Sequence, residues 1–293
     1  MSKMPPRKQH SLLIARFPYG NVDHPEVTDW LVSTVIQAKQ DDRIKHVKHV
    51  KINDTPITMT RNRVIKQAVQ SDVDFVLFVD NDMRPDLLLP GSRPFFPAAF
   101  DFALQHAGPC LIGAPYCGPP PHENVYIFRW ASQQSEHPNM DLRLEQFSRE
   151  EAAVRGGFEE VAALPTGLML IDMRFVQYLK PPYFRYEYMD AEETEKATTE
   201  DVYFTRNCSL AGVKNYVLWD AWAGHFKQKC VGKPHLLTAD QVRQEFREAL
   251  LRGHKNGEQL VMVGAGQPSK KSNWADFAKE VEQKHGSCPT EVR

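Results

Sequence analysis

Two aspartates, Asp80 and Asp82, follow directly on an apolar run, residues 75–79, that is typical of a buried β-strand. An Asp-x-Asp sequence in extended backbone places both carboxylates on the same side of the chain. Two hard oxygen donors so close together suit a divalent cation. Ligands of open α/β sheets bind beyond the carboxyl ends of the strands. The sequence therefore predicts a metal site at a sheet edge, of the kind that serves phosphate chemistry.

Three other interpretations of this triplet differ in how well they fit the flanking residues. A polar turn after a strand is common and needs no ligand. A calcium-binding EF-hand loop is excluded because Pro85 stands where that loop requires glycine. A phosphatase of the haloacid dehalogenase type expects Thr or Val two positions after the second aspartate, where this chain has Arg84.

Two further pairs of residues have types suited to binding a phosphorylated ligand. Arg61 and Asn62 lie at the start of an expected helix, where a guanidinium suits a phosphate or a base edge. Thr166 and Gly167 form a small turn before an apolar strand, where a glycine lets backbone approach a ligand closely. A solvated helix start and a simple strand-entry turn are the structural alternatives for the two pairs.

Residues near the end of the expected sheet add a candidate base and a candidate metal ligand. Glu200 and Asp201 stand at an expected helix start, where carboxylates serve either as dipole-favoured caps or as a general base in a cleft. His225 follows Gly224 after a late strand. A histidine that joined two aspartates would make a mixed nitrogen and oxygen site, which suits Mn²⁺ somewhat better than Mg²⁺.

Strands that alternate with amphipathic helices must position these side chains, and this alternation predicts an α/β fold. We expect strands at 11–16, 47–52, 75–79, 110–114, 161–164, 168–172 and 215–219, and helices at 26–39 and 60–70. Residues 136–155 and 190–199 are polar and are expected to be irregular. After residue 231 the character changes, with helical patterns beginning at Thr238 and again around Trp274.

The composition limits the class of protein but does not identify a binding partner. The chain has 293 residues and a formal net charge of −1, which gives no general attraction to nucleic acid or to anionic membranes. Its five cysteines include no Cys-x-x-Cys pair, which argues against a zinc cage or a disulfide framework. No apolar run approaches the roughly 20 residues of a transmembrane helix. We expect a cytoplasmic protein.

The order of these signals resembles that of nucleotide-sugar glycosyltransferases of the GT-A fold, in particular the family-2-like members. The ordered set is an early Pro-Tyr-Gly turn, the Arg61 helix start, the Asp80 triplet, Thr166-Gly167, and then Glu200-Asp201 followed by Gly224-His225. The resemblance runs from about residue 11 to residue 225. It implies a Rossmann-like α/β/α sandwich with a mixed, mostly parallel sheet over residues 1–231, and a helical extension over residues 232–293.

The resemblance also implies roles for single residues. The metal, Mn²⁺ or Mg²⁺, would be ligated by Asp80, Asp82 and His225. Asp201 of the Glu200-Asp201 pair would be the catalytic base in an inverting relative, a role that retaining relatives lack. The donor nucleotide-sugar, a UDP-sugar by default because the family often uses one, would be bordered by Phe17, Tyr19, Gly20, Arg61, Asn62, Asp80, Thr166 and Gly167.

Two other classes of function are compatible with the same residues. A metal-dependent phosphotransferase or nucleotidyltransferase on a similar α/β sheet would turn over a phosphate ester or nucleoside triphosphate without moving a sugar. A non-enzymatic nucleotide-binding or assembly protein would keep its function when Asp82 is replaced by alanine. The acceptor, a hydroxyl-bearing molecule, is not specified by the sequence, and a nucleic-acid acceptor is not indicated by the charge.

Overall fold

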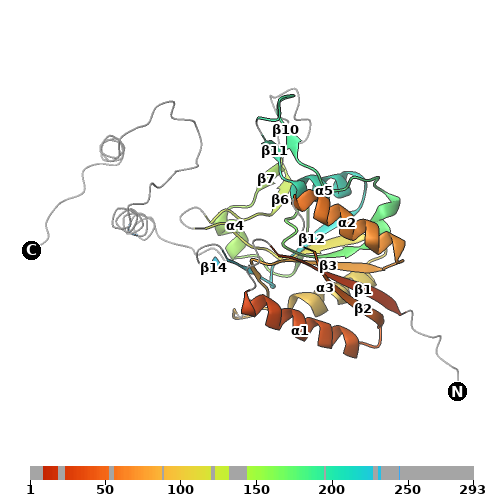
Figure 1. Cartoon of the computed structure of the whole chain (residues 1–293). Helices are drawn as coiled ribbons and strands as arrows, with labels where there is room; N and C mark the ends of the chain where they lie inside the picture. The colour runs from red at the N-terminus through yellow and green to blue at the C-terminus, as the bar shows by residue number, and fades with distance from the viewer. Residues whose placement is uncertain are drawn as a thin grey trace, which may run out of the picture. The chain divides into compact units, whose positions relative to one another are not determined.

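A mixed seven-stranded β-sheet forms the centre of the computed structural model (Figure 1), in the order β2-β1-β3-β9-β5-β12-β8. The structure describes residues 9–18, 24–52, 56–87, 89–119, 123–131, 144–194, 196–226, 230–231 and 244. Five strands run in one direction, and β9 and β8 run against them. The strands are β1 (His10–Phe17), β2 (Ile44–Lys51), β3 (Phe75–Asp80), β5 (Cys110–Gly113), β8 (Phe158–Val161), β9 (Leu168–Asp172) and β12 (Lys214–Leu218). The expected mixed, mostly parallel sheet is confirmed.

Four helices cover the two faces of this sheet and complete an α/β/α sandwich. In Figure 1, α2 (Ile57–Gln70) and α5 (Glu200–Leu210) lie on one face, and α1 (Pro25–Gln40) and α3 (Phe95–Gln105) lie on the other. Each pair packs on its own apolar cluster, because successive residues of a strand point to opposite faces. In β3, for example, Val76 and Phe78 join the α2 cluster while Leu77 and Val79 join the α1 cluster.

Three small β-sheets lie outside the large sheet. The first joins β4 (Met83–Arg84), β13 (Gly224–Phe226) and β14 (Cys230–Val231) in the order β14-β13-β4. The second pairs β10 (Glu187–Tyr188) with β11 (Lys196–Thr198), and the third pairs β6 (Phe128–Trp130) with β7 (Leu144–Gln146). The first of them is the one that matters for the site, because it brings residues near 82 and 225 together.

Some local expectations fail where the sequence pattern is weak. The polar segment 136–155 contains β7 and the short helix α4 (Arg149–Ala153), which Ser148 and Glu151 begin with a reciprocal capping box. The segment 190–199 contains β11. Helix α3 has no counterpart among the expected elements; its apolar residues run around most of the helix, and Pro97 lies in its first turn, where a missing N–H costs nothing.

The chain divides into two compact units, Met1–Asp240 and Gln241–Arg293. Apart from Gln244, which is helical, the helices expected after residue 231 fall outside the described residues. No helix in the described part of the chain is long and apolar enough to cross a membrane.

One edge of the large sheet has an unusual composition. Strand β2 lies at this edge and pairs with β1 alone among the described strands. Its sequence is IKHVKHVK, and its lysines and histidines are exposed, while its valines are half-buried and Ile44 is buried.

Candidate functional site

The backbone brings the ends of three strands together at the place predicted from Asp80. Phe17, the last residue of β1, pairs with Asp80, the last residue of β3. The Asp80 amide donates a hydrogen bond of 2.7 Å to the carbonyl oxygen of Gly167, just before β9. The Asn81 amide donates to the carbonyl of Phe17 over 3.1 Å. Phe17, Asp80 and Gly167 therefore lie side by side at one end of the sheet.

Arg61 links the Asp80 carboxylate to Glu200, a residue 139 positions further along the chain. Its Nη2 donates to both oxygens of Asp80 over 2.9 and 3.0 Å, and its Nη1 donates to Glu200 Oε1 over 2.6 Å. The Arg61 side chain is only 4% exposed and the Glu200 side chain 10%. The guanidinium also lies 5.6 Å from the centre of the Phe17 ring. Arg61, in the second turn of α2, is thus a buried cation that contacts the last residue of β3 and the first residue of α5.

The environment of Asp80 disfavours its ionised form. Burial raises its pKa to about 6, and the nearby charges of Asp82 and Asp201 act in the same direction. Arg61 opposes the shift by its charge and its hydrogen bonds. Asp80 therefore titrates close to neutral pH, which is common for residues of binding and catalytic sites.

Asp82 and His225 form a separate pair beside this ion pair. Strands β4 and β13 run antiparallel with His225 opposite Met83, and the Phe226 amide donates to the Asp82 carbonyl over 2.6 Å. The register places His225 Nε2 at 3.1 Å from Asp82 Oδ2. The Asp82 side chain is 37% exposed, whereas that of His225 is 10% exposed.

The Asp82 and His225 donors fit a divalent cation in part. Two ligands about 2.1 Å from one octahedral ion, at right angles, would lie about 3 Å apart, which is close to the observed separation. The buried His225 Nδ1 has no hydrogen-bond partner. No group of three or more His, Cys, Asp or Glu side chains in the described residues is arranged to hold a metal. The pair thus suits an ion shared with ligand phosphates, as is usual for Mg²⁺, better than a closed protein site.

Asp201 adds a carboxylate at the start of α5. The Thr199 hydroxyl and the Val202 amide, the latter over 2.8 Å, both donate to Asp201 Oδ1. The Asp201 charge contributes to the raised pKa values of Asp80 and Tyr116. Asp201 therefore belongs to the same electrostatic cluster as the triplet.

The remaining predicted residues have different surroundings. The Asn62 side chain contacts backbone: it donates to the Phe184 carbonyl over 2.7 Å and accepts from the Tyr183 and Phe184 amides. Asn62 thus holds the chain after Pro182 against α2. Thr166 is fully buried, and its hydroxyl has no hydrogen-bond partner. Tyr19 and Gly20 lie outside the described residues.

Tyr116 is a member of this cluster that the sequence pattern did not indicate. Its ring meets the His225 ring edge-on at 5.1 Å between centroids. A Cβ added at Gly167 would lie 2.8 Å from the Tyr116 hydroxyl and 2.9 Å from Met83 Sδ, so the space beside Gly167 is occupied by side chains. Burial, with the charges of Asp201 and Asp80, holds the pKa of Tyr116 well above its usual range. The phenol therefore stays protonated and can only donate or accept a hydrogen bond.

Comparisons with known proteins found solved structures with a weakly similar fold, and they did not identify a family for this chain. No protein-family model matches the sequence, and no curated protein matches it. Among solved structures, A197 from STIV is 16% identical and covers 78% of this chain and 97% of its own, with a TM-score of 0.47. An apo UDP-glucose pyrophosphorylase is 8% identical, with coverages of 85% and 99% and a TM-score of 0.38.

A third solved structure is a glycosyltransferase involved in the glycosylation of the major capsid of PBCV-1. It is 11% identical, covers 71% of this chain and 92% of its own, and has a TM-score of 0.27. At these identities and scores the likenesses carry no argument about chemistry. The α/β class follows from the sheet itself, and the function must be argued from the side chains.

Proposed function

We propose that this chain is a metal-dependent glycosyltransferase that moves a sugar from a nucleotide-diphosphate donor to an acceptor hydroxyl. One observation carries the proposal: the Asp82–His225 pair lies beside the Asp80–Arg61–Glu200 ion pairs at the carboxyl end of β3. A half-exposed carboxylate and an imidazole are available there to an ion, while the neighbouring carboxylates are held by a buried arginine. This arrangement suits an anionic ligand that brings its own share of the metal ligands.

Each residue of the site is proposed to have a role that suits its surroundings. Asp82 and His225 would hold Mn²⁺ or Mg²⁺, which neutralises the charge of a departing diphosphate when bound. Asp80, fixed by Arg61, would face the nucleotide, with the Phe17 ring beside the guanidinium. The default donor is a UDP-sugar, because the glycosyltransferases that the sequence resembles often use one.

Asp201 is the proposed base. Both of its hydrogen bonds from Thr199 and Val202 go to Oδ1, so Oδ2 is the oxygen proposed to accept the proton of the acceptor hydroxyl. The fixed Oδ1 would orient the carboxylate as the hydroxyl oxygen attacks the anomeric carbon. General base catalysis of this kind contributes about 10²–10⁴-fold to a rate.

A thermal-shift panel tests donor binding. UDP-, GDP-, dTDP- and CMP-sugars are each added with and without Mn²⁺ to the wild-type protein and to Asp82→Asn. We expect one nucleotide to stabilise the wild type in the presence of Mn²⁺, by about 2.7 kcal/mol at one hundred times its Kd. The Mn²⁺-dependent part should be lost in Asp82→Asn. Equal stabilisation of the two proteins, or none by any donor, would remove the metal assignment.

Product analysis then separates sugar transfer from its alternative. Incubation of the bound donor with hydroxyl acceptors should release the nucleoside diphosphate and form a glycoside. Release of pyrophosphate or formation of a nucleoside triphosphate would instead identify a nucleotidyltransferase. Asp201→Asn should lower turnover by about 10²–10⁴-fold while keeping the donor-induced thermal shift; near-normal turnover would exclude Asp201 as the base.

A further inference from the structure

Asn81 stands between the two aspartates of the triplet and is the most deeply buried of the three residues. It is 4% exposed, whereas Asp80 and Asp82 are half-buried. Its Oδ1 accepts two hydrogen bonds from Arg16, one from Nε over 2.9 Å and one from Nη2 over 2.6 Å. Its backbone amide donates to the carbonyl of Phe17. The middle residue of the triplet is thus fixed to β1 through both its side chain and its backbone.

Arg16 approaches the triplet from the face of the sheet opposite to Arg61. Its neighbour Phe17 belongs to the α2 cluster, and successive residues of a strand point to opposite faces, so Arg16 points toward α1. There its Nη1 donates to the hydroxyl of Thr28 over 3.3 Å. Arg61 reaches Asp80 from α2, on the other face. Two buried arginines, one from each face, therefore hold successive residues of the triplet.

This double hold determines where the next residue, Asp82, lies. The peptide bond from Asn81 sets the starting point of Asp82, and the Asp82 carbonyl then accepts from the Phe226 amide over 2.6 Å. The Asp82 carboxylate lies 3.1 Å from His225 Nε2. Metal sites tolerate deviations of only about 0.2 Å in their ligand distances, so small movements of the chain at Asn81 would separate the two donors. Groups that orient metal ligands in this way affect affinity although they do not touch the ion.

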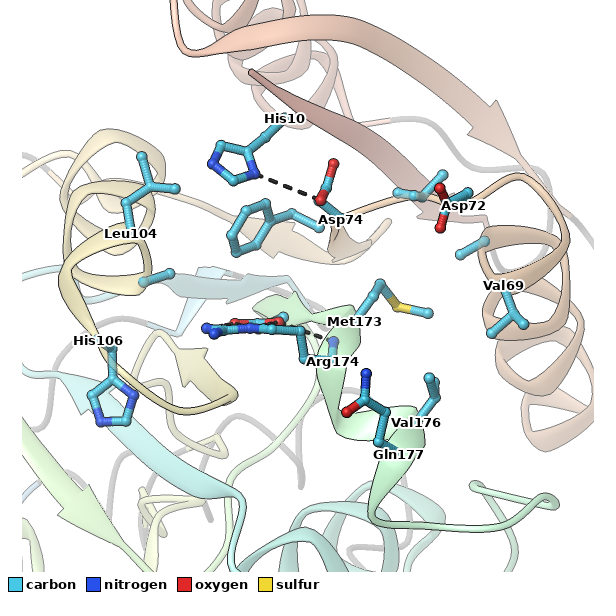
Figure 2. Close-up of a pocket in the computed structure, with 15 residues that line it drawn as sticks. His10, Val69, Asp72, Asp74, Leu104, His106, Met173, Arg174, Val176 and Gln177 are labelled. Atoms are coloured by element: carbon cyan, nitrogen blue, oxygen red, sulfur yellow. Dashed lines mark hydrogen bonds and ion pairs between the residues drawn. The ribbon is translucent and has the colours of Figure 1, made fainter. Parts of the chain in front are cut away.

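The other end of β1 and β3 provides a similar contact that is remote from the metal donors. Asp74, directly before β3, accepts from the amide and the hydroxyl of Ser11 in β1 over 2.8 and 2.9 Å. Figure 2 shows the cavity of about 480 Å³ at this end, with His10 and Asp74 in contact. Ser11 is five residues before Arg16, or about 17 Å at the rise of a strand. The contact between Ser11 and Asp74 ties the two strands together without reaching the triplet.

We propose that Arg16 is a positioning residue of the proposed metal site, because by holding Asn81 it keeps Asp82 opposite His225. The inference rests on the proposed function, but the hold on Asp82 is a property of the metal-free protein and can be measured there. The alternative is that Arg16 and Asn81 only tie β1 to β3. In that case breaking their contact would lower stability, as at the Ser11 end, and would leave Asp82 in place.

Hydrogen exchange of the Phe226 amide, followed by NMR, reports on Asp82 in the absence of metal. Asn81→Leu has a side chain of similar size and removes the acceptor of Arg16. Exchange of the Phe226 amide should become about tenfold faster or more, relative to the amide of Leu170 in the central strand β9, because local opening is separated in this way from global unfolding. An unchanged ratio would overturn the proposal.

Two further variants separate the hold on Asp82 from stability in general. Asn81→Asp keeps acceptor oxygens for the Arg16 guanidinium, and the exchange ratio should stay within about threefold of wild type. Ser11→Ala breaks the contact at the other end of the same strands and should lower stability without changing the ratio. A rise in Ser11→Ala as large as in Asn81→Leu would show a general loosening of the sheet and overturn the proposal.

Mn²⁺ titration followed by electron paramagnetic resonance tests the consequence for the metal. Asn81→Leu and Arg16→Met should each weaken Mn²⁺ binding by about tenfold or more. The double variant should lose no more than either single variant, because both act through one contact. Additive losses, or single variants with wild-type affinity, would overturn the role of Arg16 alone, and Asn81→Leu decides this if Arg16→Met does not fold. A wild-type protein that binds no Mn²⁺ would overturn the proposed metal site itself, and this role with it.

Discussion

Asp80 and Asp82 are two residues apart in the same triplet, and yet their side chains differ in their partners and in their exposure to solvent. The Asp80 carboxylate is held on both oxygens by Arg61, a buried cation that also binds Glu200. The Asp82 carboxylate contacts His225 and is the more exposed of the two, at 37% against 23% for Asp80. Two acids that look equivalent in the sequence thus differ in the structure: Asp80 joins β3 to α2 through Arg61, whereas Asp82 contacts His225 and is more exposed.

The largest expected effect comes from removing the cation on the Asp80 side. Arg61→Met should lower the free energy of unfolding by about 3–5 kcal/mol, because it leaves two carboxylates buried without their partner. Urea denaturation followed by circular dichroism measures it. Arg206→Met, which breaks a more exposed ion pair with Glu187, is the matched control and should cost much less. A loss below about 1 kcal/mol in Arg61→Met would show that Arg61 does not hold the site together.

A smaller effect, and one of a different kind, is expected on the Asp82 side. His225→Ala should weaken Mn²⁺ affinity by about 10–100-fold, or about 1.4–2.7 kcal/mol, because it removes one of two donors from the ion. Its cost in unfolding free energy should stay below that of Arg61→Met. Mn²⁺ titration monitored by electron paramagnetic resonance gives the affinity, with His49→Ala on the exposed edge strand as control. Unchanged Mn²⁺ binding would take His225 out of the site.

A third effect is a pH dependence of stability to which Asp80 contributes. Its pKa rises from 3.8 to about 6 on folding, so between those values the native state binds more protons than the unfolded state. The contribution of Asp80 to stability is therefore complete below about pH 4 and is lost as the pH rises through about 6, at up to about 1.4 kcal/mol per pH unit.

Asp80→Asn isolates this contribution, because asparagine does not titrate. The stability of the variant relative to the wild type should rise between about pH 4 and 6 and stay constant above about pH 7. Urea unfolding of both proteins at each pH provides the difference. A relative stability that is flat, or that falls over this interval, would mean that the pKa of Asp80 is not raised.

The sequence predicted those parts of the fold that depend on local pattern. Strand β9 was expected at the residues it occupies, and β3 and α1 were expected to within one residue at each end, because a continuous apolar run or a helical stripe marks each of them. The direction of β9 could not be predicted in the same way. A strand buried on both faces has the same apolar pattern whether it runs with or against its neighbours.

Residues of the site that belong to a sequence motif could be predicted. Residues that meet only because the chain folds could not. Asp80, Asp82 and His225 carry signals of type and order, and the structure places Asp82 and His225 in contact. The bond from Arg61 to Glu200 spans 139 positions, and no local pattern relates its two ends. Tyr116 follows a short strand as a single aromatic residue with no periodic partner, so its place beside His225 depends on the tertiary fold alone.

The composition of β2 has a consequence for the solubility of the protein. An open sheet edge can template the addition of a strand from another molecule, which leads to aggregation. The formal net charge of −1 gives only weak repulsion between copies of this chain, so its own charge does little to prevent that. The exposed Lys45, Lys48 and Lys51 place like charges along the one strand that would have to meet its copy. Neutralising Lys45 and Lys48 would leave only Lys51 on this strand, and concentration-dependent light scattering would register any resulting assembly.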